Sequence, residues 1–216
     1  MRMKKLLILH GLNNKVEALH ELGKSFAGEF DVIYMKLPHH SEGPLSFNIK
    51  TTLKNFRNEL SDVLIDDPYI ISYSLGCTYL QYFFEKGLID FTLEKVIYLS
   101  PALKTKFNLA RLRFLPTYFP LPSFSPKEFR LRSFCYWGQY RMLFELTKKL
   151  ELNHYPKTFA DPEDELIRLE GIKYRPLNRE YLSYGEHHLS FHPRYFKNNE
   201  WEELIREIKV RFQEET

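Results

Sequence analysis

The segment Ile70-Ile71-Ser72-Tyr73-Ser74-Leu75-Gly76 decides the fold class, because an apolar run and a helical pattern meet there with almost no loop between them. Pro68 to Ser74 carries continuous rather than alternating apolar residues, which is typical of a strand buried on both faces. Leu75 to Lys86 follows directly with the period of a helix. A buried strand that passes straight into a helix predicts a sheet covered by helices.

The same alternation of apolar runs and helical periods extends along the whole chain. Further strands are predicted at Lys5–His10, Asp31–Leu37, Leu93–Ser100, His154–Ala160 and Glu180–Gly185. Helices are predicted at Val16–Phe30, Thr51–Ile65, Tyr140–Leu150 and Glu200–Phe212. With right-handed crossovers and the first strand in the centre, these elements form a doubly wound, mostly parallel six-stranded sheet in the order 2-1-3-4-5-6. We therefore expect a single α/β domain over residues 1–216.

Composition and charge argue against several classes of protein. Of the 216 residues, 44% are hydrophobic and 27% are charged, and the net charge of +3 is too small to indicate nucleic-acid binding. The apolar run Leu6–Leu9 is too short for a signal peptide, and no stretch approaches the ~20 apolar residues of a membrane-spanning helix. Cys77 and Cys135 do not indicate a disulfide framework. We expect a cytoplasmic protein.

Ser74 has the surroundings that a nucleophilic serine needs. A serine hydroxyl becomes a useful nucleophile only when a base takes its proton and nearby donors stabilise the oxyanion. A tight strand-to-helix turn projects the hydroxyl above the sheet, and it needs small residues two positions before and after the serine. Ser72 and Gly76 occupy these positions. The alternative is a buried strand that ends in serine, with Gly76 relaxing the turn.

Two strand ends meet at the place where such a sheet binds ligands. In the predicted order, the first and third strands flank the point where the strand order reverses, and ligands bind there at the carboxyl ends of the strands. His10-Gly11-Leu12 follows the first strand, and Ser74 ends the third. The sequence therefore predicts a site at this edge of the sheet.

These segments resemble the α/β-hydrolase superfamily, and within it the small bacterial serine esterases and lipase-like proteins. Leu6 to Leu12 is similar to the first core strand and its His-Gly oxyanion loop. Leu37 to Gly43 is similar to the loop after the next strand, with two of the usual glycines absent. Ser72 to Gly76 is similar to the Gly-x-Ser-x-Gly turn, with serine at the first glycine. The resemblance implies a minimal α/β-hydrolase fold.

The resemblance also implies the oxyanion hole and the acid of a catalytic triad. The backbone N–H groups of Leu12 and Leu75 would form the oxyanion hole. The acid would follow the fifth strand, where Asp164 aligns best with the family's pattern in the segment Thr158 to Ile167. The nearby rivals are Asp161, Glu163 and Glu165. An acidic cap on the next helix is the structural alternative for this cluster.

The base would lie just past the last strand. Tyr184-Gly185-Glu186-His187-His188 resembles the family's Gly-x-His landmark, which points to His187 and leaves His188 as an alternative. The order Ser, Asp, His along the chain is the one this superfamily uses. Neither this histidine cluster nor the pair at 39 and 40 has the spacing of a metal site, and no phosphate-binding or dinucleotide motif occurs. We therefore expect neither a metal nor a cofactor.

Residues 104–140 are expected to form a short cap or lid within the domain. This segment is rich in aromatic residues and carries seven lysines and arginines against one acid, Glu128. One interpretation is packing, with the aromatics sealing the cap on the sheet. The other is an apolar acyl pocket with a basic rim that favours anionic esters or transient contact with an anionic lipid surface. In that case Tyr73, Phe119 and Trp137 contact the substrate.

These features favour a serine hydrolase that cleaves carboxylic esters, with a small or lipid-like acyl group, through a Ser74–His187–Asp164 acyl-enzyme mechanism. A thioesterase or an amidase would use the same triad. A non-catalytic interaction protein on this fold is the alternative from a different class, with the basic, aromatic segment 104–140 as its partner surface.

Overall fold

The computed structural model describes residues 3–11, 19–39, 48–104, 138–162, 164, 167–179, 191 and 193–214. Six strands form one sheet in the order β2-β1-β3-β4-β5-β6, and all five pairings are parallel. The strands are β1 Lys4–Leu9, β2 Phe30–Met35, β3 Tyr69–Tyr73, β4 Val96–Leu99, β5 Lys157–Ala160 and β6 Arg175–Pro176. The strand order and the doubly wound α/β class predicted from the sequence are therefore confirmed.

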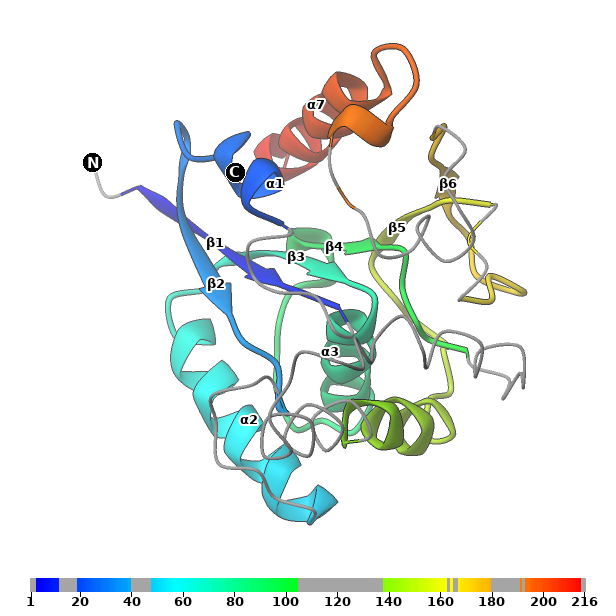
Figure 1. Cartoon of the computed structure of the whole chain (residues 1–216). Helices are drawn as coiled ribbons and strands as arrows, with labels where there is room; N and C mark the ends of the chain where they lie inside the picture. The colour runs from blue at the N-terminus through cyan, green and yellow to red at the C-terminus, as the bar shows by residue number, and fades with distance from the viewer. Residues whose placement is uncertain are drawn as a thin grey trace, which may run out of the picture.

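Helices cover both faces of this sheet (Figure 1). They are α1 His20–Lys24, α2 Ile49–Leu64, α3 Leu75–Glu85, a helix over 138–147, and α7 Glu200–Glu214, with 3-10 turns η2 Leu93–Lys95 and η4 Pro193–Tyr195. Helix α2 begins at Asn48, whose side chain accepts hydrogen bonds from the N–H groups of Lys50 and Thr51. Only Ser74 separates the end of β3 from the start of α3, in agreement with the near absence of a loop that the sequence predicts.

Successive residues of each strand point to opposite faces, so the sheet separates two hydrophobic cores. On β3, Ile70 packs with α2, α3 and the helix over 138–147. Ile71 and Tyr73 pack on the other face with α1 and α7. Figure 1 shows the same division, with α1 and α7 on one side of the sheet and α2 and α3 on the other. Because both faces are covered, β3 and β4 are buried along their whole length.

The structure differs from the sequence-based prediction at two elements. The sixth strand was predicted at Glu180–Gly185, but the strand that pairs with β5 is Arg175–Pro176. This strand is only two residues long and contains a proline, so it has no apolar pattern to recognise; residues 180–185 lie outside the described residues. The helix predicted at Val16–Phe30 is also shorter: its described part is α1, and turns at 25–29 lead into β2.

Buried polar contacts fix α3 against the rest of the molecule. The hydroxyl of Thr78 donates to the carbonyl of Ala102 at 2.8 Å, just beyond β4. Further along, the amide of Gln81 donates to Glu85 and to the carbonyl of His154, and Gln81 accepts from the Tyr98 hydroxyl. Because Ser74 is the N-cap of α3, these bonds also set the position of the strand-to-helix turn.

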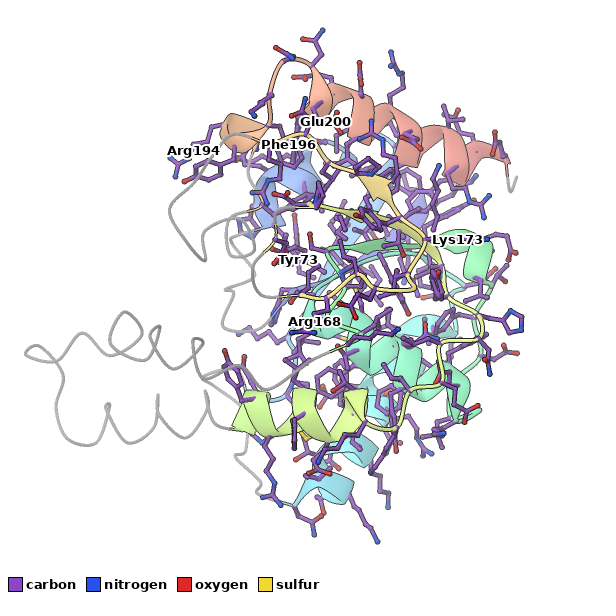
Figure 2. The ribbon with its side chains drawn as sticks, turned by 90° about the vertical axis from the view of Figure 1, so that its right-hand side faces the viewer. Tyr73, Arg168, Lys173, Arg194, Phe196 and Glu200 are labelled. Atoms are coloured by element: carbon purple, nitrogen blue, oxygen red, sulfur yellow. The ribbon has the colours of Figure 1, made fainter. Side chains whose placement is uncertain are left out.

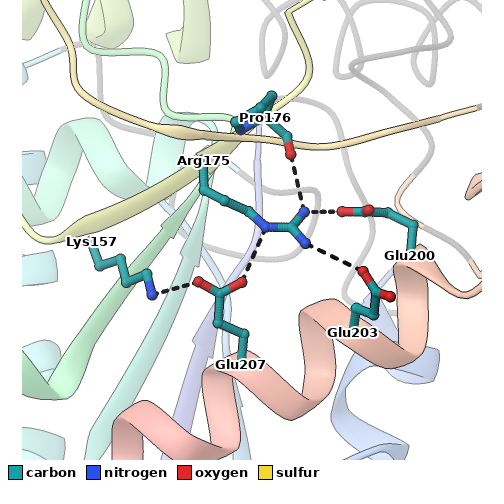
Figure 3. A network of polar contacts seen from close by, with 6 residues as sticks. All are labelled: Lys157, Arg175, Pro176, Glu200, Glu203 and Glu207. Carbon is teal, nitrogen blue, oxygen red and sulfur yellow. Dashed lines mark hydrogen bonds and ion pairs between the residues drawn. The ribbon is translucent and has the colours of Figure 1, made fainter.

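An ion-pair network joins α7 to the edge of the sheet (Figure 3). Glu207 of α7 accepts from Arg175 of β6 at 3.1 Å and from Lys157 of β5 at 2.6 Å. Arg175 also pairs with Glu200 and, at 3.8 Å, with Glu203. Such partly exposed pairs contribute modestly each, so the apolar face of α7 supplies most of the docking free energy. Among the described helices, none is both long and apolar enough to cross a membrane.

The contribution of α7 can be tested on its two faces. Ile208 is fully buried and Val210, two residues along, is 46% exposed. We expect Ile208→Ala to lower the free energy of unfolding by about 2–5 kcal/mol, since it leaves a cavity against the sheet. Val210→Ala should change it by less than about 0.5 kcal/mol. Urea denaturation followed by circular dichroism measures both, and equal effects would contradict the assigned faces.

Candidate active site

Ser74 has a strained backbone at the junction of β3 and α3. Its φ of 50° and ψ of −113° lie in a region that residues other than glycine rarely adopt. It is buried, at 1% exposure. Such strain persists only where the surroundings over-determine the conformation, and it is concentrated at functional sites. This is the backbone geometry that a nucleophile-bearing turn requires.

Hydrogen bonds on both sides of Ser74 hold this conformation. Its N–H donates to the carbonyl of Leu99 on β4 at 3.0 Å. Its carbonyl accepts from the N–H of Cys77 at 3.1 Å and from the N–H of Ala102 at 3.3 Å. The turn is therefore tied to the end of β4 as well as to the first turn of α3.

Two glycines allow the backbone to close around the turn. A Cβ atom on Gly76 would lie 2.7 Å from the Ser72 hydroxyl and 2.9 Å from the His10 carbonyl. A Cβ atom on Gly11 would lie 2.8 Å from the Ser74 Cβ. All three distances are shorter than real Cβ contacts, so a side chain at either position would displace its neighbours. The small residues predicted around Ser74 are thus in close contact, and Gly11 joins them from the end of β1.

His10 fixes the loop that follows β1, a role that the sequence analysis missed. Its Nδ1 lies 2.9 Å from the Gly11 carbonyl, which can only accept, so Nδ1 carries the proton. Its Nε2 accepts from the N–H of Leu37 at 3.1 Å, just after β2. The ring is 1% exposed and, with one donor and one acceptor, is neutral. The only sequence signal for this role is that His10 stands immediately before Gly11, and that position does not predict the contact with Leu37.

The structure describes one of the two residues predicted to donate to the oxyanion. Leu75 is the first residue of α3, and the first N–H groups of a helix have no partner within the helix. Its N–H therefore points out of the helix end beside Ser74. Leu12, the other predicted donor, lies outside the described residues.

Asp164 is a buried residue four positions beyond the end of β5. Its carboxylate accepts from the N–H of Ile167 at 3.2 Å, and its own N–H donates to the carbonyl of Asp161, also at 3.2 Å. Asp164 is 9% exposed and Asp161 is 2% exposed. Asp161 forms an ion pair with Arg179, with 3.8 Å between Nη1 and Oδ2. The two acids that the sequence left as alternatives therefore have different surroundings.

Tyr73, at the end of β3, interacts electrostatically through its hydroxyl with Asp164 and with the Arg179–Asp161 pair. Burial raises the pKa of its hydroxyl well above the usual value, the charge of Asp164 raises it further, and the charge of Arg179 opposes the rise. Its ring packs on that of Phe191, with 5.5 Å between the centroids. Figure 2 shows Tyr73 within the interior, with Phe196 and Glu200 on its side toward α7. Tyr73 is 1% exposed, and its contact with a substrate stays a prediction.

The structure brings together part of the predicted site. Ser74, Leu75, Tyr73 and Asp164 belong to the carboxyl-end edge of β3 and β5. The predicted residues that lie outside the described residues are Leu12, Phe119, Trp137, Glu163, Glu165, His187 and His188. Arg179 was not predicted, because nothing in its local sequence marks it. In the described part of the chain, no group of three or more His, Cys, Asp or Glu side chains could hold a metal ion.

Gly11 and Gly28 provide a matched pair of substitutions. An added methyl group at Gly11 would meet Ser74, whereas nothing lies within 4 Å of the corresponding position at Gly28. We expect Gly11→Ala to displace the turn and to lower any Ser74-dependent activity at least about tenfold, since small misplacements are costly at a reacting centre. Gly28→Ala should leave activity unchanged. Steady-state rates measure both, and equal rates would contradict the close packing of Gly11 on Ser74.

Cys77 is expected to be chemically silent in the folded protein. Burial raises the pKa of its thiol far above neutrality, and its Sγ donates to the carbonyl of Ser72 at 3.0 Å. Only the thiolate reacts with disulfide reagents. In a Cys135→Ser background, the native protein at pH 8 should therefore react only slowly with Ellman's reagent and should release one equivalent in denaturant. Rapid labelling of the native protein would contradict this burial.

Comparisons with known proteins place this geometry in a fold family. No protein-family model matches the sequence, and no curated protein is detectably similar to it. Among solved structures, an α/β hydrolase fold protein from Burkholderia ambifaria is similar, with a TM-score of 0.55, 11% identity, and 78% of this chain and 77% of that chain covered. A monoacylglycerol lipase from Paleococcus ferrophilus has a TM-score of 0.54 and 14% identity, covering 98% and 96%.

The thioesterase domain of NocB, solved as a covalent complex with a fluorophosphonate nocardicin G analogue, has a TM-score of 0.55 and 11% identity, covering 96% and 94%. At these identities the similarity is one of fold. It agrees with the strand order, the parallel pairing and the strained serine at the end of β3. The chain therefore has the fold of the α/β-hydrolase superfamily.

Proposed function

We propose that this protein is a serine hydrolase that cleaves carboxylic esters, with Ser74 as its nucleophile. The observation that carries the proposal is the conformation of Ser74: a strained, buried serine at a strand-to-helix junction, tied by hydrogen bonds to Leu99 and Ala102. A backbone conformation of this kind costs of the order of 1–3 kcal/mol, and at Ser74 it stands at the point where β3 passes directly into α3.

The proposed reaction proceeds in two acyl-transfer steps. His187 takes the proton of Ser74 as its oxygen attacks the ester carbonyl, and the N–H groups of Leu75 and Leu12 stabilise the oxyanion. Collapse releases the alcohol, which takes the proton from His187. Water, deprotonated by His187, then attacks the acyl-enzyme; the bond between the acyl group and Ser74 breaks, the acid leaves, and the Ser74 oxygen takes the proton back from His187. Asp164 orients the imidazole and stabilises its charged form. Its buried carboxylate, held by the N–H of Ile167, supports this assignment over Asp161, which pairs with Arg179.

We assign residues 104–140 to a cap over this site, with Phe119 and Trp137 against the acyl group. The support comes from the two described ends of the segment. Leu103 follows Ala102, whose N–H donates to the Ser74 carbonyl. At the other end, Gly138 packs on the ring of His39, and the Gln139 amide donates to the His39 carbonyl at 3.0 Å. Since His39 follows β2, both ends lie at the carboxyl edge of the sheet.

A thioesterase is the second proposed function, because the same triad accepts thioesters. The NocB thioesterase domain is as similar in fold as the monoacylglycerol lipase. Matched p-nitrophenyl esters and acyl thioesters of equal chain length separate the two functions by their kcat/KM values. We expect the esters to be preferred, and a preference for thioesters of tenfold or more would favour the second function.

Replacing Ser74 tests the enzyme proposals together. We expect Ser74→Ala to lower ester turnover by about 10⁴–10⁶-fold and to abolish labelling by a fluorophosphonate probe, which needs a serine activated by a working base. The matched control is Ser100→Ala, since Ser100 is also buried, also has a positive φ of 43°, and directly follows the neighbouring strand β4. The control should keep its labelling.

The fold of both variants is checked by circular dichroism. Retained turnover in Ser74→Ala would remove Ser74 from the mechanism. Absence of labelling in the wild-type chain would favour a non-catalytic interaction protein on this fold.

A further inference from the structure

A buried ion pair lies next to the proposed acid. The side chains of Arg179 and Asp161 are 1% and 3% exposed, and Nη1 and Oδ2 are 3.8 Å apart. A charge this deep in a protein is costly unless an opposite charge compensates it. The pair joins two segments of the sheet edge, because Asp161 directly follows β5 and Arg179 lies three residues beyond β6.

Arg179 is fixed on its other side as well. Its guanidinium carbon lies 5.2 Å from the centre of the Phe196 ring, within the range of a cation–π interaction. Its backbone forms an antiparallel bridge with Phe196. Arg179 is therefore held by both its main chain and its side chain, so its charge has a fixed position relative to Asp161.

The same pair reaches Asp164 through the backbone. The Asp161 carbonyl accepts the N–H of Asp164, so a shift of Asp161 moves the proposed acid directly. The charges also act on a shared neighbour. Among the described residues, the titratable groups that influence the Tyr73 hydroxyl are Asp164, Asp161, Arg179 and Cys77. Cys77 is neutral there, since burial raises its pKa. Within the Arg179–Asp161 pair the two charges compensate each other, and the carboxylate of Asp164 stands outside that pair.

We propose that Arg179 is a positioning residue for Asp164: it holds Asp161 in place and compensates its charge, so that Asp164 acts on the base without a second, uncompensated carboxylate from Asp161. The inference rests on the proposed function, because it assumes that Asp164 orients a catalytic histidine. In a triad, the negative charge of the acid stabilises the imidazolium that forms on the base. A second uncompensated carboxylate would hold the base protonated, and no net charge would weaken it as a base.

The proposal predicts how the acidic limb of the pH profile of kcat/KM responds to charge. Asp161→Asn keeps the shape and the backbone bond but removes a negative charge, which leaves Arg179 opposing Asp164. Protonation of the base then becomes harder, so the limb should move to lower pH by about half a unit to one unit. Asp161→Asn/Arg179→Met removes both charges of the pair together, so its limb should return to the wild-type position. If Arg179 and Asp161 had a purely structural role, the substitutions would lower the rates, and the double variant would not return the acidic limb to its wild-type position.

A matched control makes the same chemical change elsewhere. Asp67 forms an ion pair with Lys95 at the opposite, amino-terminal edge of β3 and β4, and its φ of 48° suits asparagine. Asp67→Asn should leave the limb in place. Because Arg179 and Asp161 are buried, the shift in Asp161→Asn should persist at high salt, which would screen a surface effect.

The experiment measures kcat/KM for a p-nitrophenyl ester, and the rate of fluorophosphonate labelling, across pH 5–9, with folding checked by circular dichroism. The proposal is overturned if the acidic limb of Asp161→Asn stays at its wild-type position. It is also overturned if the limb of the double variant shifts as far as that of Asp161→Asn. If Asp161→Asn does not fold, Arg179→Lys replaces it: the charge is kept, so the limb should stay while kcat falls, and a moved limb would overturn the proposal. Ester turnover that survives Ser74→Ala would instead overturn the proposed function.

Discussion

The site depends on the backbone of Ser74 being held where it would not rest on its own. The bond from its N–H to Leu99 makes the end of β4 part of the turn, and the bonds from Cys77 and Ala102 to its carbonyl make the turn part of α3. These contacts exist only because β3 and β4 are parallel neighbours in register. The strained residue is therefore a product of the sheet as a whole, and its geometry is lost if either strand shifts.

Much of this arrangement could be predicted from the sequence, for identifiable reasons. The central strands are continuous apolar runs, and β3 passes into α3 without a loop, so their order and the serine at their junction follow from pattern alone. Small residues are predicted at Ser72 and Gly76 because backbone segments approach each other at such a turn. The structure has this close approach, since a Cβ atom on Gly76 would lie 2.7 Å from the Ser72 hydroxyl. The prediction succeeded where local sequence and tertiary structure impose the same requirement.

It failed where the requirement comes from a distant part of the chain. Strand β6 has two residues and a proline, and it exists because its neighbour β5 offers free backbone groups, so no local pattern marks it. Arg179 is one arginine among many until the fold places it against Asp161 and Phe196. The role of His10 depends on Leu37, which is 27 residues away. Such contacts are set by the ends of strands, where the chain carries the least periodic information.

The division of the core has a consequence for how the chain acquires its structure during synthesis. One face of β1 and β3, with Leu6, Ile8 and Ile71, is covered in part by α7, and Phe212 of that helix packs on Tyr69 at a centroid distance of 4.6 Å. The strands leave the ribosome well before α7 is made. Their apolar face must wait for about 190 residues of further chain in the case of β1 and about 130 in the case of β3, at about 5–20 residues per second. During that interval the nascent sheet presents the kind of surface that chaperones bind.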